Sequence, residues 1–289
     1  GLNDSRVVNL SESLARSGLV VMVTRSEKMT DYKIDPNAVA TIIKAFEYLH
    51  DLEYTDESKI GMGGFCVGAS LSAIAAQDIR IRQKVSFLNL FGAYADARNL
   101  ISAVASKTRF YENLLTQWNP NEQTWLTFRN HMLDSVSHES DRLILENYHV
   151  NLQPDPEPID MPTLRSKEAI IVHSLLKGVT LEQSIQLLGN MPDEFQTDLD
   201  RISPIHNVKD LSAKVLIMHD INDTNIPAEE SKRLANAIGV NEQIYYTEFS
   251  MFDHMDPTRS LGKFQWAKEI MKLFLHLNHM LEVADHPSV

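Results

Sequence analysis

The stretch Gly64-Phe65-Cys66-Val67-Gly68 decides the fold, because it joins a strand-like segment directly to a helix-like segment. Apolar residues before it predict a strand over residues 59–65, and the pattern after it predicts a helix over residues 67–76. A turn this sharp strains the backbone of its central residue. We expect glycine at positions 64 and 68 because a Cβ atom there would hold the strand and the helix apart.

Strand-like and helix-like segments alternate on both sides of this turn. Short apolar runs predict further strands at residues 19–23 and 85–91, and helical spacing of apolar residues precedes the first of them. The pair Asp35-Pro36 supplies a helix cap followed by proline at the first helical position. This alternation predicts an α/β fold with a mostly parallel sheet and helices on both of its faces.

The alternation stops near residue 98. Residues 99–200 are polar, lack strand-like apolar runs and predict helices, with a loop that contains Pro154, Pro156 and Pro158. We therefore expect this segment to be a helical cap inserted into the α/β core.

The alternation returns near residue 201. Strands are predicted at residues 215–219 and 243–249, with a helix at 228–238 between them and an apolar-striped helix near the end. The expected core thus consists of residues 1–98 and 201–289.

Cys66 is the candidate nucleophile of the chain. It stands between a strand and a helix, where the positive end of the helix dipole stabilises a thiolate. The backbone N–H of Val67, the next residue, is placed to donate to an oxyanion that develops on an acyl substrate. A lone cysteine at the start of an apolar helix is more often a small buried side chain, so further residues must support the chemistry.

Two later loops supply that support. Asp223 follows the predicted strand 215–219, and His254 follows the predicted strand 243–249. Parallel strands present their carboxyl ends at one edge of a sheet, where open α/β sheets place their sites. Nucleophile, acid and histidine in this chain order are expected to form a catalytic triad.

These residues resemble the α/β-hydrolase superfamily over nearly the whole chain apart from the cap. Gly64–Gly68 is similar to the nucleophile elbow in its cysteine form, as in dienelactone hydrolases and polyhydroxyalkanoate synthases. The acid loop is similar to the pattern H-G-x-x-D-x-x-V-P, which assigns the acid to Asp223 and leaves Asp220 at the glycine position. The large cap differs from a minimal dienelactone hydrolase, and the histidine segment differs from that of the synthases, so the subfamily stays open.

The resemblance also implies strands and an oxyanion loop ahead of the first helix. The sequence begins at Gly1, on the edge of that helix, so these N-terminal strands are expected to be missing, either because the chain is a fragment or because the fold lacks them. The second oxyanion donor is then expected in the backbone near Gly1 or Leu2.

The implied activity is that of an acyl hydrolase, of the class of carboxylic ester and lactone hydrolases, acting on an ester, thioester or lactone. A Cys-His-Asp triad would act through a thioester acyl-enzyme on a small-molecule acyl substrate, with no cofactor and no metal. Two alternatives stay open. One is acyl transfer to an acceptor other than water, and the other is a ligand-binding protein on a hydrolase scaffold without activity.

Several other residues admit a second interpretation. Gly61-Met62-Gly63-Gly64 is similar to a dinucleotide fingerprint, but Cys66 occupies its third glycine position and no acidic residue follows at the required distance. Ser70 and Ser72 are expected to pack or cap rather than to act as nucleophiles. His276 and His279 have a metal-like spacing without partner ligands, which favours a structural role.

The aromatic residues Phe110, Tyr111, Trp118 and Trp125 of the expected cap have two interpretations. They could line an acyl pocket, or they could form the internal packing of the cap, which is the commoner role.

The composition narrows the classes of partner. The chain has 289 residues, is 43% hydrophobic and carries a net charge of -12, with no basic run that could follow a nucleic-acid backbone. A single cysteine excludes an internal disulfide, and no apolar run reaches the length of a membrane span. We expect a cytoplasmic protein with no nucleic-acid partner and no membrane span.

Overall fold

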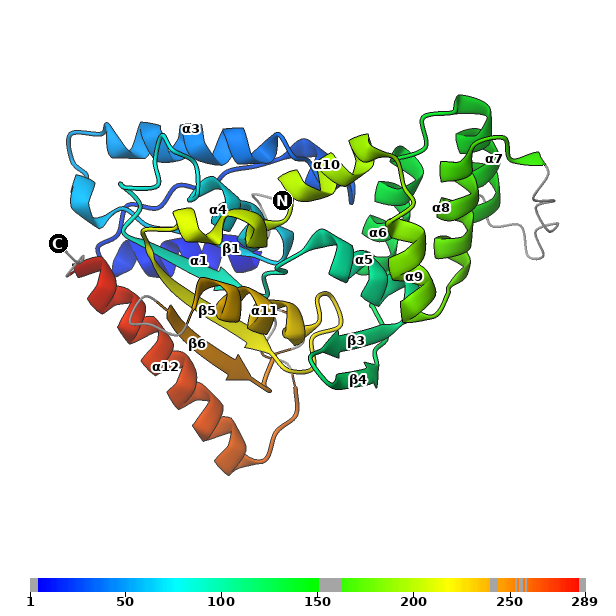
Figure 1. Cartoon of the computed structure of the whole chain (residues 1–289). Coiled ribbons are helices and arrows are strands. Elements are labelled where there is room, and N and C mark those ends of the chain that lie inside the picture. Colours follow the sequence, from blue (N-terminus) through cyan, green and yellow to red (C-terminus); the bar gives the residue numbers. More distant parts are fainter. Residues whose placement is uncertain are drawn as a thin grey trace.

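A four-stranded parallel sheet forms the centre of the molecule. The computed structural model describes residues 5–150, 163–239, 244–252, 254, 257 and 259–285. Its sheet has the order β1-β2-β5-β6, and every neighbouring pair is parallel (Figure 1). The strands are β1 (Met62–Phe65), β2 (Phe87–Phe91), β5 (Lys214–Asp220) and β6 (Ile244–Phe249).

Helices cover both faces of this sheet, as predicted. One face packs in a single apolar cluster with residues of α3 (Ala38–His50), α4 (Val67–Ala75) and α11 (Ala228–Ile238). The other face packs against α1 (Ser5–Arg16) and α12 (Lys263–Asp285). Both faces are thus shielded from water, as a parallel sheet requires. None of the helices in the described ranges is long and apolar enough to cross a membrane.

The segment between β2 and β5 is mainly helical and forms a lobe at one end of the sheet (Figure 1). Its elements are α5 (Ala97–Ser106), β3 (Thr108–Tyr111), β4 (Leu114–Gln117), α6 (Glu122–Asp134), α7 (Glu139–His149), α8 (Lys167–Lys177), α9 (Leu181–Leu188) and α10 (Asp193–Arg201). The antiparallel hairpin β3–β4 was not predicted, because its short strands carry no continuous apolar run. The predicted loop with Pro154, Pro156 and Pro158 lies outside the described residues.

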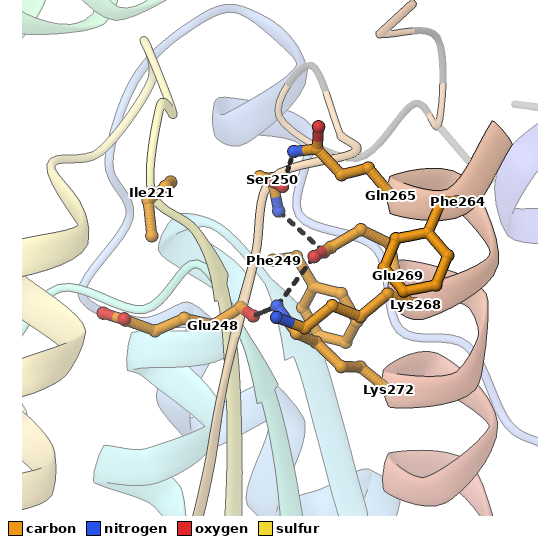
Figure 2. Close-up of a pocket in the computed structure, with 9 residues that line it drawn as sticks. All are labelled: Ile221, Glu248, Phe249, Ser250, Phe264, Gln265, Lys268, Glu269 and Lys272. Carbon is orange, nitrogen blue, oxygen red and sulfur yellow. Dashed lines mark hydrogen bonds and ion pairs between the residues drawn. The ribbon is translucent and has the colours of Figure 1, made fainter. Parts of the chain in front are cut away.

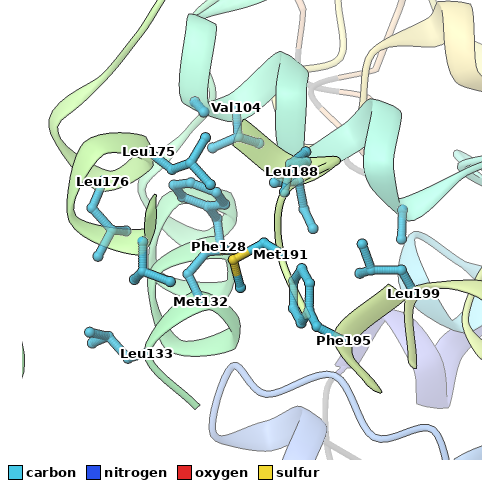
Figure 3. Packing of buried hydrophobic residues seen from close by; sticks show 14 of the residues in the cluster. Val104, Phe128, Met132, Leu133, Leu175, Leu176, Leu188, Met191, Phe195 and Leu199 are labelled. Atoms are coloured by element: carbon cyan, nitrogen blue, oxygen red, sulfur yellow. The ribbon is translucent and has the colours of Figure 1, made fainter. Parts of the chain in front are cut away.

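One apolar cluster joins the inserted helices to the core. Its members within the insertion include Phe128 of α6, Leu175 of α8, Leu188 of α9 and Leu199 of α10 (Figure 3). The same cluster contains Leu71 of α4 and Ile226 of the loop after β5. The insertion therefore packs directly on the elements that carry the candidate site.

The predicted strand at residues 19–23 is wrong. Residues 19–26 form no regular element, and Val20, Met22 and Val23 are 47%, 38% and 43% exposed. A strand exists only through hydrogen bonds to a neighbour. The described sheet ends at β1, which pairs on one side with β2 and does not pair with this segment.

The starts of β1 and α3 also differ from the prediction. Residues 57–59 form the 3-10 helix η1 (Glu57–Lys59), so that β1 begins only at Met62. Helix α3 begins at Ala38, two residues after the predicted proline start. Asp35 accepts a hydrogen bond from the N–H of Asn37 (3.1 Å), which makes it part of the turn ahead of the helix.

The two glycines that flank Cys66 have different environments. A Cβ atom on Gly64 would lie 2.6 Å from the carbonyl oxygen of Gly68 and 2.7 Å from the nitrogen of Ala69. Backbone atoms cannot move away as a flexible side chain can, so the expected steric reason applies to Gly64. A Cβ atom on Gly68 would meet no atom within 4 Å, so the same reason does not apply there.

We expect Gly64→Ala to destabilise the fold by about 1–3 kcal/mol or more, the usual cost of forcing an extra carbon into a packed site. The matched substitution Gly68→Ala lies within α4 and should leave stability unchanged or raise it by about 0.5–1 kcal/mol. Urea unfolding of both variants measures the difference. Equal effects of the two substitutions would show that the strand–helix contact at Gly64 is not tight.

Candidate active site

Cys66 sits on the turn between β1 and α4 in a backbone conformation that only the surrounding structure can hold. Its φ and ψ angles are 55° and -130°, and positive φ is rare for a residue with a side chain. The N–H of Cys66 donates to the carbonyl of Phe91 at the end of β2 (2.8 Å), which anchors the turn to the sheet. The side chain is partly buried against the apolar cluster of the insertion.

The N–H of Val67 stands at the first position of α4, where the helix itself offers no acceptor. Among the described residues, none accepts a hydrogen bond from it. The N–H of Val67 is therefore available to donate a hydrogen bond to an oxyanion. The other expected donors, near Gly1 and Leu2, lie outside the described residues.

Asp223 lies in the loop after β5 and is almost completely buried, at 2% exposure. One carboxylate oxygen, Oδ1, accepts from the N–H groups of Asn225 (2.6 Å) and Ile226 (3.3 Å). The other, Oδ2, lies 2.9 Å from Nδ1 of His254. The loop thus fixes one oxygen and leaves the other for the histidine.

His254 lies in the loop after β6, with 14% of its side chain exposed. Because a carboxylate can only accept, Nδ1 carries the proton in this pair. Burial lowers the pKa of His254, but its hydrogen bonds with Asp223 and Cys66 and the charges of both outweigh this and raise the pKa to about 10. The structure therefore brings Cys66, Asp223 and His254 together.

A second histidine, His219, contacts the same carboxylate and was missed by the sequence analysis. It is fully buried at the end of β5, and its Nε2 lies 3.5 Å from Oδ2 of Asp223 and 3.0 Å from the carbonyl of Ile226. Nδ1 meets the hydroxyl of Ser231 at 2.7 Å. Burial raises the pKa of Asp223, but hydrogen bonds from His219 and His254 outweigh it and hold that pKa well below the usual range.

Gly92 was also missed. It follows β2 with a φ of +66°, and a Cβ atom there would lie 3.6 Å from Oδ2 of Asp223 and 3.9 Å from both His219 and His254. The left-handed conformation favours glycine, whereas a Cβ atom at these distances would make only ordinary van der Waals contact with the acid and the two histidines. Its place directly after a strand was the available signal.

The insertion is hydrogen-bonded to the loop that carries Asp223. The indole N–H of Trp118 donates to the carbonyl of Asp223 (2.8 Å), and the N–H of Asn121 donates to the carbonyl of Thr224 (2.9 Å). The hydroxyl of Thr124 donates to the carbonyl of Asn225 (3.0 Å). The segment from β4 to α6 therefore holds the acid loop in place.

The other aromatic side chains of the insertion make packing contacts, some within the insertion and some with the core. Trp125 lies against Phe128 with a ring separation of 5.3 Å. The guanidinium of Arg233 on α11 covers the rings of Phe110 and Tyr111 at 4.9 and 5.1 Å. The contact of Trp125 agrees with the expected internal packing, whereas Phe110 and Tyr111 also lie against the core helix α11.

The two serines after Cys66 are held by main-chain groups. Ser70 donates to the carbonyl of Tyr94 (3.0 Å) and accepts from its N–H, and Ser72 donates to the carbonyl of Gly63 (3.2 Å). Both are buried within α4. Their positions agree with the expected packing role.

His276 is buried beneath the sheet, between Thr247 (2.9 Å) and Asn89 (3.1 Å). Burial, together with the smaller effect of the nearby His279, lowers the pKa of His276 to about 4. Within the described ranges, no three His, Cys, Asp or Glu side chains are arranged to hold a metal ion.

An open groove of about 410 Å³ lies beside the site, between the end of β6 and the start of α12 (Figure 2). Its floor is organised by Glu269, which accepts from the N–H of Ser250 (2.9 Å) and pairs with Lys272 (2.7 Å). Cys66, Asp223 and His254 do not line it. The residues that line the groove therefore contact Ser250, at the start of the loop that carries His254, and not the candidate reacting groups.

The arrangement as a whole is α/β-hydrolase-like. A strained turn follows β1, and the acid and the histidine follow β5 and β6, the two strands beyond β2 in the parallel sheet. No protein-family model matches the chain, and no curated protein matches it.

Solved structures show distant similarity. An acylaminoacyl peptidase of Pyrococcus horikoshii is 14% identical over 83% of this chain and 27% of its own, with a TM-score of 0.42. Acetyl xylan esterase 1 of Thermoanaerobacterium sp. JW/SL YS485 is 11% identical over 92% and 60% (TM-score 0.42). DcsB in complex with its substrate analogue is 16% identical over 98% and 86% (TM-score 0.45). The chain thus spans about a quarter of the length of the peptidase.

The raised pKa of His254 predicts a pH-dependent contribution to stability. Because the pKa is higher in the folded state, the contribution is complete below the ordinary value of 6.5 and is lost as the pH rises to about 10. We expect the difference in free energy of unfolding between the wild-type protein and His254→Gln to shrink between those two pH values. Urea unfolding at both pH values measures it.

An NMR titration of the imidazole is the direct control. His254 should titrate near pH 10 in the wild-type protein, and Asp223→Asn should lower its pKa because the main stabilising hydrogen bond is removed. An unchanged pKa in Asp223→Asn would contradict the assigned cause.

Proposed function

We propose that the protein is an acyl hydrolase that acts on an ester, thioester or lactone through Cys66, His254 and Asp223. The observation that carries this proposal is the 2.9 Å contact between His254 and Asp223 beside a cysteine held at positive φ. Strain of this kind persists only where the surrounding structure enforces it, and it concentrates at functional sites. The distant solved structures include a peptidase and an esterase, which is consistent with acyl chemistry on this fold.

The first half of the reaction would form a thioester. The sulfur of Cys66 attacks the acyl carbon with its proton held by His254, and the electron pair of the carbonyl moves to its oxygen, which the N–H of Val67 stabilises. When the tetrahedral intermediate collapses, the bond to the leaving group breaks and protonated His254 supplies its proton. The raised pKa of His254 suits this step, because the imidazolium is the dominant form at neutral pH.

The second half would release the acid. Cys66 carries no charge in the thioester, so one of the interactions that raise the pKa of His254 is gone, and neutral imidazole becomes accessible. His254 then takes a proton from water as the water attacks the thioester. When this second tetrahedral intermediate collapses, the C–S bond breaks and the acid is released. The proton on His254 then returns to the sulfur of Cys66 or stays on His254 as an imidazolium–thiolate pair. Asp223 keeps the proton of His254 on Nδ1, so that Nε2 is the atom that exchanges protons with the substrate.

The inserted helices between residues 99 and 200 would act as a cap over the acyl group. Cys66 and Val67 pack against the same apolar cluster as these helices, which places apolar surface beside the reacting sulfur. An apolar cover excludes bulk water and selects substrates by size. An apolar acyl chain is therefore the expected substrate portion on that side.

A panel of p-nitrophenyl esters, thioesters and lactones tests the activity. We expect Cys66→Ala and His254→Gln to lower kcat/KM by roughly 10³-fold or more, as loss of a nucleophile or its base usually does. His206→Gln is a matched control because His206 also pairs with an aspartate, Asp200 at 3.1 Å, but away from the site. It should keep full activity.

Covalent labelling separates an enzyme from an inactive scaffold. Chain-wide there is one cysteine, so a thiol-directed electrophile reports on Cys66 alone. We expect fast labelling that slows in His254→Gln. Full esterase activity in Cys66→Ala, or labelling that does not depend on His254, would overturn the proposal.

A further inference from the structure

Asp220, which occupies the position of glycine in the resembled acid-loop pattern, is buried at the last position of β5 with 0% exposure. Its carboxylate spans two loops. Oδ1 accepts from the N–H of Asn222 (2.9 Å), one residue before Asp223, and Oδ2 accepts from the N–H of Phe252 (2.8 Å), two residues before His254. Glycine at this position could form neither contact.

Arg259 binds the same two residues from the other side. Its Nε donates to the carbonyl of Phe252 (2.5 Å), and its Nη2 donates to the carbonyl of Asn222 (2.8 Å). The guanidinium also lies 3.9 Å from Oδ1 of Asp220. The N–H and C=O groups of Asn222 and Phe252 are thus all bound by one acid and one base.

We propose that Asp220 and Arg259 form a clamp that positions the triad by holding the acid loop and the histidine loop at a fixed separation. This inference rests on the proposed function, since it assigns a task to residues that touch no reacting atom. Asp223 and His254 lie on different loops, and their 2.9 Å contact requires both loops to keep their register. Displacement of about 1 Å at a reacting group can cost roughly 100-fold in rate.

The aromatic ring of Phe252 adds apolar contacts to the same connection between the two loops. It stacks edge-on against Phe91 (5.0 Å) and Phe249 (5.3 Å), which are the last residues of β2 and β6. These contacts hold the side chain of Phe252 to the sheet, while the clamp fixes its main chain relative to Asn222. The direction of the peptide chain toward His254 therefore depends on the clamp.

Asp220→Asn tests the clamp with little change of shape. An amide keeps one acceptor oxygen but presents an NH₂ group to the second backbone N–H, so one loop is released. We expect kcat to fall roughly 10- to 100-fold with little change in KM, because the triad rather than the substrate site is displaced. The NMR-measured pKa of His254 should fall from about 10 toward 6.5 as its bond to Asp223 lengthens.

Arg259→Gln tests the second residue of the clamp independently of Asp220→Asn. Because 28% of the Arg259 side chain is exposed, we expect this variant to fold even if Asp220→Asn does not. Glu230→Gln is the matched control. Glu230 is a buried carboxylate that also accepts from two backbone N–H groups, those of Ala95 (3.1 Å) and Asp96 (3.2 Å), and pairs with Arg233. It should lose stability without a change in the pKa of His254.

The pKa of His254 can be measured without any substrate, which separates the two hypotheses. If the wild-type protein is inactive on every acyl substrate but Asp220→Asn or Arg259→Gln still lowers that pKa, the clamp stands and the proposed function fails. If both variants keep the pKa and kcat of the wild-type protein, or if Glu230→Gln shifts the pKa equally, the clamp is refuted.

Discussion

The position of β5 between β2 and β6 is the constraint on which the candidate site depends. Parallel pairing of β1, β2, β5 and β6 brings the carboxyl ends of these strands to one edge, and with them the turn at Cys66 after β1, the loop of Asp223 after β5 and the loop of His254 after β6. Residues separated by more than 150 positions meet there because the ladder has a fixed register. The N–H of Cys66 donates to Phe91 of β2 and that of Gly92 donates to Met218 of β5, so the backbone hydrogen bonds of the sheet extend one residue beyond β1 and β2.

Burial of Asp223 gives this edge its electrostatic character. A carboxylate without solvent must be satisfied by the protein, and here two backbone N–H groups and two imidazoles meet that need. The same contacts keep the acid ionised and His254 protonated at neutral pH. Through Trp118, which follows β4, the insertion also takes part in holding the acid loop, so the two segments are directly connected.

The sequence patterns were informative where one local rule decides the outcome. Gly64 and Cys66, two residues later, indicated the turn, because steric exclusion of a Cβ atom acts between residues close in sequence. The order of acid and histidine after the last two strands followed from the direction of parallel strands. The patterns failed at residues 19–23, whose apolar composition suits a buried strand but whose hydrogen-bonding neighbour must come from elsewhere in the fold.

Sequence alone was sufficient to predict a parallel α/β core, an inserted helical segment and three candidate residues, since hydrophobic periodicity and chain order are local or one-dimensional properties. The sequence did not show that a steric need for glycine exists at position 64 but not at position 68. It also did not indicate that His219 and Gly92 are neighbours of Asp223. It placed Asp220 in the acid loop without a role. These roles arise only when distant segments come within hydrogen-bond distance, because a contact of about 3 Å depends on the packed three-dimensional arrangement and leaves no periodic trace in the chain.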